Sequence, residues 1–214
     1  MKAKRLDWFL SELQGFESPK IKLEQYATSP EMAVSIAECM DDQIDDGLEG
    51  KSLADLGCGC GMLMIATSLT SDLDYCLGID VDTDALNTCR ENINHAELSN
   101  KCDLLQADVL SLEKTISAQF DIVVTNPPFG TKNNAGLDMQ FVQSGLSILK
   151  EGGSLFSLHK RSTRNYILKT ANNWQNIEAE CVAELRWELP ATYKFHKKKA
   201  VDIEVDLIMF SKNV

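Results

Sequence analysis

The chain has 214 residues, 44% of them hydrophobic and 25% charged, with a formal net charge of −11 at pH 7. This size and composition fit one globular domain, residues 1–214, and disfavour disordered and fibrous classes. No apolar run approaches the ~20 residues of a membrane-spanning helix, so we expect an intracellular, soluble protein with no membrane partner. Seven scattered cysteines without a CxxC pair predict neither a disulfide framework nor a metal site. The negative charge means that binding to nucleic acid would need a local basic patch or a partner.

Hydrophobic periodicity predicts two helices within residues 1–50, followed by alternating strands and helices. The first helix has Leu6, Phe9, Leu10 and Leu13 on one face, and the second begins at a capping box from Thr28 to Glu31. Strands are predicted at 52–56, 75–79, 102–107, 120–125, 154–158, 177–189 and 201–210. Helices are predicted at 61–69, 83–95, 137–149 and 163–173, with Gly152-Gly153 as the stop after the third. This order predicts an α/β, Rossmann-like, mostly parallel seven-stranded sheet with an antiparallel last strand and helices on both faces.

A glycine-rich turn, Asp55-Leu56-Gly57-Cys58-Gly59-Cys60-Gly61, joins the first predicted strand to its helix. Such a turn can be merely structural, but it also lets a ligand approach the backbone and the helix N-terminus. Asp80 and Asp108 end the next two strands, where acids can accept hydrogen bonds from ribose hydroxyls and from an adenine amine. Because all three features fall on the carboxyl edge of one sheet, they predict a nucleoside site. The pattern resembles the S-adenosylmethionine site of class I methyltransferases.

The fourth predicted strand ends in Asn126-Pro127-Pro128-Phe129. Prolines lack an N–H and hold φ near −65°, so this corner is fixed and rich in hydrogen-bond acceptors. The Asn126 side-chain oxygen and the Pro127 carbonyl could each accept one hydrogen of a planar amine, and Phe129 could stack on a base. The motif resembles the catalytic motif of methylases that act on amino or amide nitrogens. It points to a nucleobase amine, and less strongly to a protein glutamine.

Motifs along nearly the whole chain together look like the eukaryotic methyltransferase-like adenine N6-methylase of small-subunit ribosomal RNA. They are 15–17, 23–28, 54–61, 126–133, 157–160, 183–186, 189–191, 193–199 and 201–206. The resemblance implies N6 methylation of one adenosine in 18S rRNA with S-adenosylmethionine, in a heterodimer with a small zinc-binding activator subunit. It further implies that residues 1–50 cap the cofactor site, and a location in the nucleus, nucleolus and cytoplasm. The cofactor-pocket residues that it implies are Gln25, Thr28, Gly57, Cys60, Met62, Asp80, Asp108 and Val109, beside Asp55, Gly59 and Gly61 of the glycine turn. Ala27 and Met62 depart mildly from the family pattern.

Two basic segments are candidates for RNA contact. The denser one, Tyr193–Lys199, contains Lys194, Lys197, Lys198 and Lys199, and the second begins at Lys160-Arg161. A charge run is often only a solvated loop, but cations alternating with aromatic residues can bind a backbone and stack bases. The strand 102–107 should lie at a sheet edge, where the activator could add a strand and cover Leu104 and Leu105.

Two other classes of function stay open from the residues. One is methylation of a different planar amine, either guanine N2 of rRNA or a protein glutamine. The other is a non-catalytic scaffold that retains the cofactor fold. The acid pair, the glycine turn and the Asn-Pro-Pro-Phe motif argue against the scaffold.

Overall fold

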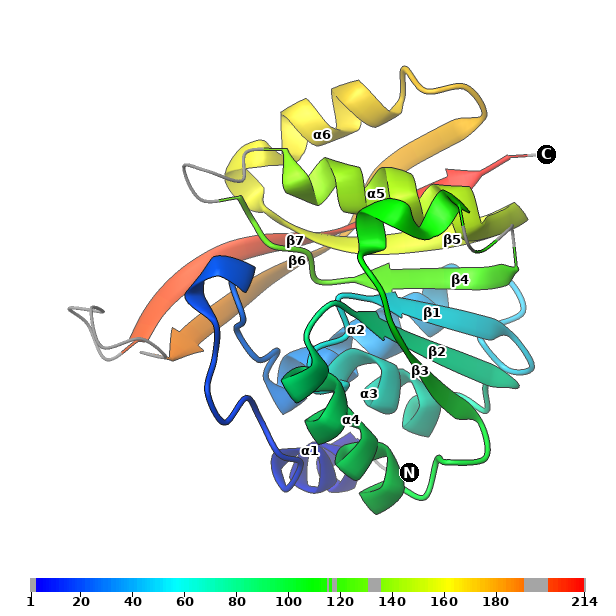
Figure 1. Cartoon of the computed structure of the whole chain (residues 1–214). Helices are drawn as coiled ribbons and strands as arrows, with labels where there is room; N and C mark the ends of the chain where they lie inside the picture. The colour runs from blue at the N-terminus through cyan, green and yellow to red at the C-terminus, as the bar shows by residue number, and fades with distance from the viewer. Residues whose placement is uncertain (1–2, 115, 117–118, 131–135, 191–199, 214) are drawn as a thin grey trace.

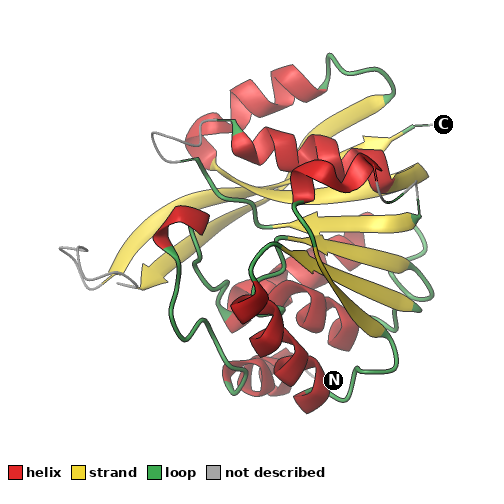
Figure 2. Ribbon diagram, viewed as in Figure 1, coloured by secondary structure: helices red, strands yellow, loops and turns green. Residues whose placement is uncertain are grey.

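The computed structural model describes residues 3–114, 116, 119–130, 136–190 and 200–213. These residues form one sheet between two layers of helices (Figures 1 and 2). The strands are β1 (Ser52–Leu56), β2 (Tyr75–Asp80), β3 (Cys102–Gln106), β4 (Phe120–Thr125), β5 (Leu149–Lys160), β6 (Ile177–Pro190) and β7 (Ala200–Lys212). Their order is β3-β2-β1-β4-β5-β7-β6, with β7 antiparallel to both of its neighbours and the pairs from β3 to β5 parallel. The predicted fold class is confirmed.

The helices divide between the two faces of the sheet and bury two hydrophobic clusters. One face packs against α1 (Ala3–Ser11), α2 (Pro30–Gln43), α3 (Met62–Thr70) and α4 (Thr83–His95). The other packs against α5 (Leu137–Ile148), α6 (Arg164–Ala171) and the 3-10 helix η2 (Val109–Lys114). Successive side chains of a strand point to opposite faces, so Leu53 of β1 joins the first cluster and Ala54 the second. Two further 3-10 turns, η1 (Ile21–Leu23) and η3 (Arg161–Thr163), lie at the carboxyl edge of the sheet.

Two local predictions are wrong, and one short element was not predicted. Ser29, not Thr28, caps α2, because its side chain accepts a hydrogen bond from the Met32 amide. Gly152 and Gly153 lie inside β5 instead of ending α5; the strand starts directly at Leu149 and its register with β4 shifts there. A Cβ at Gly153 would stand 2.7 Å from the Asp121 carbonyl oxygen, so this irregularity requires glycine. The 3-10 helix η2 follows β3 at a place where no element was predicted.

The strand β3 lies at one edge of the sheet, as predicted. Leu104 and Leu105 are half-buried and pack against opposite hydrophobic clusters, so the free edge itself consists of backbone. At the other side, the long β6–β7 hairpin extends past the carboxyl ends of the other strands (Figure 1). Within the described residues, every helix is too short or too polar to span a bilayer.

Candidate active site

The glycine turn lies between β1 and α3 with φ values that favour glycine. Gly59 has a φ of +54° and Gly61, which starts α3, a φ of +87°. A Cβ at Gly59 would lie 2.8 Å from Phe16 Cζ, and one at Gly61 would lie 2.5 Å from Cys89 Sγ. The two glycines therefore allow the backbone conformation, and they let the N-terminal segment pack on the turn at Gly59 and α4 pack on it at Gly61.

Asp80 fixes the turn from the end of β2. Its Oδ2 accepts a hydrogen bond from the Gly59 amide at 2.9 Å, and its Oδ1 accepts one from the Asp82 amide at 2.8 Å. Burial raises the pKa of Asp80, and these two backbone hydrogen bonds partly oppose that rise. Since each carboxylate oxygen can accept more than one hydrogen bond, Asp80 can hold the turn and still bind a hydroxyl.

A cavity of about 350 Å³ opens at this carboxyl edge, and a smaller one of about 60 Å³ adjoins it. The two cavities share Phe16, Tyr26, Gly57, Gly59 and Asn126. The larger is also lined by the predicted residues Gln25, Asp80, Asp108, Val109 and Pro128, and the smaller by Thr28, Asp55, Cys60 and Met62. Gly61, Pro127 and Phe129 lie outside both linings. The fold thus brings most of the predicted residues to one connected site.

The Asn126 side chain stands where the two cavities meet. Its Nδ2 donates a hydrogen bond to Thr28 Oγ1 at 3.1 Å, which joins the end of β4 to the segment before α2. Pro127 behind it is buried, and Pro128 lines the larger cavity. With the amide nitrogen committed to Thr28, the amide oxygen faces away from that contact and is the end that can accept from a ligand.

Comparisons with known proteins identify the family of this chain. Residues 35–179 match the family model described as the methyltransferase small domain. The chain is 59% identical over 213 residues to the rRNA N(6)-adenosine-methyltransferase metl-5 of Caenorhabditis elegans, covering 99% of both chains. It is 48% identical over 211 residues to the rRNA N(6)-adenosine-methyltransferase METTL5 of Danio rerio, again covering 99% of both.

The chain belongs to the METTL5 family of methyltransferases. Its fold also matches the crystal structure of PH1948 from Pyrococcus horikoshii, with a TM-score of 0.83 and 29% identity over 100% of this chain and 98% of that one. The protein is therefore an enzyme, and its methyl donor is S-adenosylmethionine.

The METTL5-family site contains a buried polar atom that fits this donor. Asp55 is 1% exposed and lines the smaller cavity; its Oδ2 accepts from the Met64 amide at 3.2 Å, while its Oδ1 has no partner among the described residues. Burial raises the pKa of Asp55 to about 7. A cationic ligand would relieve that cost, and the ammonium group of S-adenosylmethionine is such a cation. Asp80 and Asp108 would then face the nucleoside part, although one Asp108 oxygen already accepts from the Leu110 amide at 3.0 Å.

Gln25 lines the larger cavity, as the resemblance implies, and it also holds the N-terminal segment in place. Its Nε2 donates to Asp82 Oδ2 and its Oε1 accepts from the Lys20 amide, each at 2.7 Å. Lys20 Nζ in turn donates to Asp82 and to Asp84 at the start of α4. These contacts fasten the N-terminal segment over the site, so Gln25 lines the cavity as part of a fixed wall.

Three aromatic side chains line the METTL5-family site although they were not among the predicted site residues. Phe16 and Tyr26 line both cavities, and Phe141 of α5 lines the larger one. A Cβ at Gly57 would lie 3.2 Å from Phe141 Cε1, so that ring packs directly on the turn. The motif around Phe16 was a signal for it, whereas nothing in the helix predicted at 137–149 singled out Phe141.

The candidate RNA-binding residues have different surroundings. Lys160 Nζ lies 5.7 Å from the centroid of the Phe129 ring, which joins the end of β5 to the Asn-Pro-Pro-Phe corner. Arg161 next to it contacts three carboxylates, those of Glu184, Glu204 and Asp206. Lys194, Lys197, Lys198 and Lys199 lie outside the described residues. The role of all six cations in RNA binding stays a prediction.

Proposed function

We propose that this chain transfers the methyl group of S-adenosylmethionine to N6 of an adenosine in rRNA, specifically in 18S rRNA, as the catalytic subunit of a heterodimer. The observation that carries the proposal is the Asn126 amide, anchored through Nδ2 to Thr28 at the junction of the two cavities. The names of the METTL5 relatives support the choice of an rRNA adenosine.

The chain's own residues contribute mainly by position. An exocyclic amine is a poor nucleophile because its lone pair is delocalised into the ring. We expect Asn126 Oδ1 and the Pro127 carbonyl oxygen to accept its two hydrogens, which favours a pyramidal nitrogen with a directed lone pair. S-adenosylmethionine, when bound, supplies the electrophilic methyl group. Orientation of this kind can lower a barrier by up to ~7–11 kcal/mol.

The target base must leave its stack to reach Asn126, so an exposed or mismatched nucleotide is the favoured substrate. We expect Phe129 to stack on that base while the Lys160 ammonium lies over the Phe129 ring. A flat pocket of this kind also admits guanine. The choice between adenine and guanine therefore has to be measured from the product.

The test is methyl transfer to 18S rRNA transcribed in vitro, with radiolabelled S-adenosylmethionine and digestion of the product to nucleosides. N6-methyladenosine supports the proposal. N2-methylguanosine, or label in protein glutamine, would replace it with the second candidate activity. Binding of S-adenosylmethionine without any transfer, in the presence of the partner subunit, would favour a scaffold.

We further propose that the small zinc-binding activator subunit adds a strand to β3. The support is the position of β3 at the sheet edge, with Leu104 and Leu105 only half-buried. Leu105→Lys should abolish copurification of the two subunits and lower the solubility of the coexpressed pair. Thermal unfolding of the variant chain alone separates lost folding from lost pairing, and an intact, soluble complex would refute this placement.

We also propose a location in nucleus, nucleolus and cytoplasm, which can be checked by imaging the tagged full chain.

A further inference from the structure

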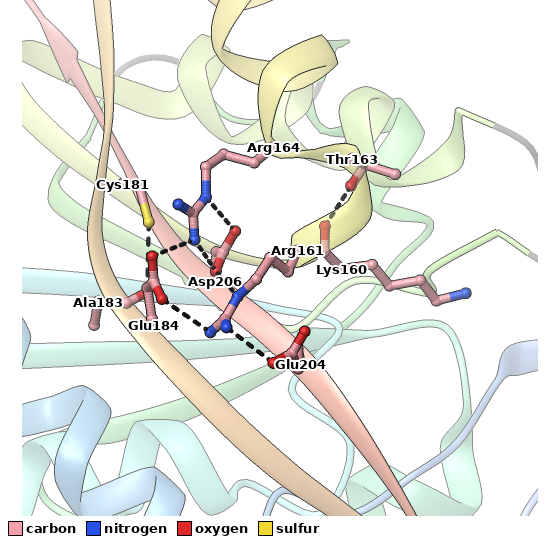
Figure 3. A network of polar contacts seen from close by, with 9 residues as sticks. All are labelled: Lys160, Arg161, Thr163, Arg164, Cys181, Ala183, Glu184, Glu204 and Asp206. Carbon is pink, nitrogen blue, oxygen red and sulfur yellow. Dashed lines mark hydrogen bonds and ion pairs between the residues drawn. The ribbon is translucent and has the colours of Figure 1, made fainter.

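A network of two arginines and three acids joins the end of β5 to the β6–β7 hairpin (Figure 3). Arg164 donates from Nε to Asp206 Oδ2 and from Nη2 to Asp206 Oδ1, both at 2.7 Å. Arg161 donates from Nε to Asp206 Oδ1 at 3.2 Å and from Nη1 to Glu204 Oε1 at 3.1 Å, and its Nη2 lies 3.4 Å from Glu184 Oε2. The two arginines thus share acids but bind them with different geometry.

We infer that Arg161 exchanges its partners. Its guanidinium gives up its contacts with Glu184 and Glu204 and binds a phosphate of the RNA backbone beside the flipped target base. This inference rests on the proposed action on RNA. Arg161 follows Lys160 directly, and the Lys160 ammonium lies over Phe129 of the base-binding corner. In Figure 3 the Lys160 side chain points away from the network while the Arg161 guanidinium points into it. Once Arg161 has released its acids, its guanidinium would therefore be a free cation close to the corner at Phe129 where we expect the base to bind.

Burial of the partners shows why Arg161 can leave and Arg164 cannot. The Asp206 side chain is fully buried, whereas the Glu184 and Glu204 side chains are 55% and 57% exposed. Exposed ion pairs are screened by water and contribute little, so exchanging them for a phosphate costs little. When Arg161 leaves, Asp206 keeps both short hydrogen bonds from Arg164, and no buried charge loses its last partner. Loss of Arg164 would instead leave Asp206 with one 3.2 Å contact.

The small cost of breaking these exposed ion pairs can still discriminate between RNAs. The five side chains carry a net charge of −1 from two arginines and three acids, so the network itself does not attract RNA while Arg161 is paired. A phosphate held close by the bound target base can compete with Glu204, whereas a passing RNA strand competes poorly. Removing the Glu204 charge should therefore increase binding of any RNA through Arg161.

The test measures the Kd of the full chain with its partner for 18S rRNA transcribed in vitro and for poly(U), at several salt concentrations. Arg161→Gln should weaken 18S rRNA binding several-fold and reduce the slope of log Kd against log salt by about 0.7, the value for one phosphate of a single strand. Arg161→Lys should recover part of the affinity, because an ammonium still pairs with phosphate. Glu204→Gln should tighten poly(U) binding by up to about fivefold.

A double-mutant cycle separates partner exchange from simple repulsion. If Arg161 is the group released, Glu204→Gln has no effect on poly(U) binding in the Arg161→Gln background; an undiminished effect there overturns the inference. Arg164→Gln should lower the melting temperature far more than Arg161→Gln, and the reverse order would also overturn it. Arg90→Gln, on the exposed face of α4, is the control for loss of one positive charge. RNA binding that is insensitive to Arg161 refutes the exchange, whereas intact binding without N6-methyladenosine refutes the proposed function.

Discussion

The hydrogen bond between Asn126 Nδ2 and Thr28 Oγ1 should determine the turnover rate, because it orients the amide that we expect to hold the substrate amine. Thr28→Val removes the acceptor while preserving the shape of a side chain that is 6% exposed. A hydrogen bond of this kind contributes about 1 kcal/mol, which corresponds to roughly a fivefold change in rate. We therefore expect kcat to fall about fivefold. Thr28→Ser, which keeps the hydroxyl, should stay close to the wild type.

Single-turnover methylation of 18S rRNA at saturating S-adenosylmethionine measures this effect, and equilibrium binding gives the Kd of the donor for each variant. Thr28 also lines the smaller cavity, so it could act by contacting the donor instead. In that case Thr28→Val would weaken donor binding as much as it slows transfer. Equal loss in both measurements, or equal rates for the Val and Ser variants, would refute a role through Asn126.

Three more predictions follow from the same site. Asn126→Ala should lower kcat by about 10²–10³-fold, on the scale of removing one preorganised polar group, while the donor Kd measured by calorimetry changes by only a few-fold; a matching loss of donor affinity would contradict its role. Gly59→Ala should weaken donor binding at least tenfold, because the new Cβ would stand 2.8 Å from Phe16 Cζ at a φ of +54°, and unchanged calorimetric affinity would exclude that conflict. Burial raises the pKa of Asp55 to about 7, so the folded state binds more protons than the unfolded state from about pH 4 to 7, and the stability of the ligand-free chain falls as pH rises across that range. Asp55→Asn should therefore raise the melting temperature relative to wild type more at pH 8 than at pH 5; a difference that does not change with pH would refute the buried charge.

Local sequence patterns predicted the succession of strands and helices along the chain and much of the site. Glycines at Gly57, Gly59 and Gly61, acids at the ends of two strands and a proline corner each have a local physical meaning, and a parallel sheet brings its strand ends to one edge. Those rules placed Asp80 and Asn126 at one site without any knowledge of packing. They also placed β3 at the edge, since that follows from the topology alone.

Tertiary structure decided which group each side chain contacts, because those contacts join residues far apart in the chain. Thr28 looked like a helix cap but accepts from Asn126, and Gln25 binds Asp82. Gly152-Gly153 looked like a helix stop, yet the register between β4 and β5 places it in a strand. Arg161 and Arg164 are alike in sequence. Only their contacts differ: Arg164 makes two short bonds to buried Asp206, whereas Arg161 makes one longer bond to it and pairs otherwise with exposed acids. Short-range propensity carries no information on such pairings, which depend on how the sheet and its helices pack.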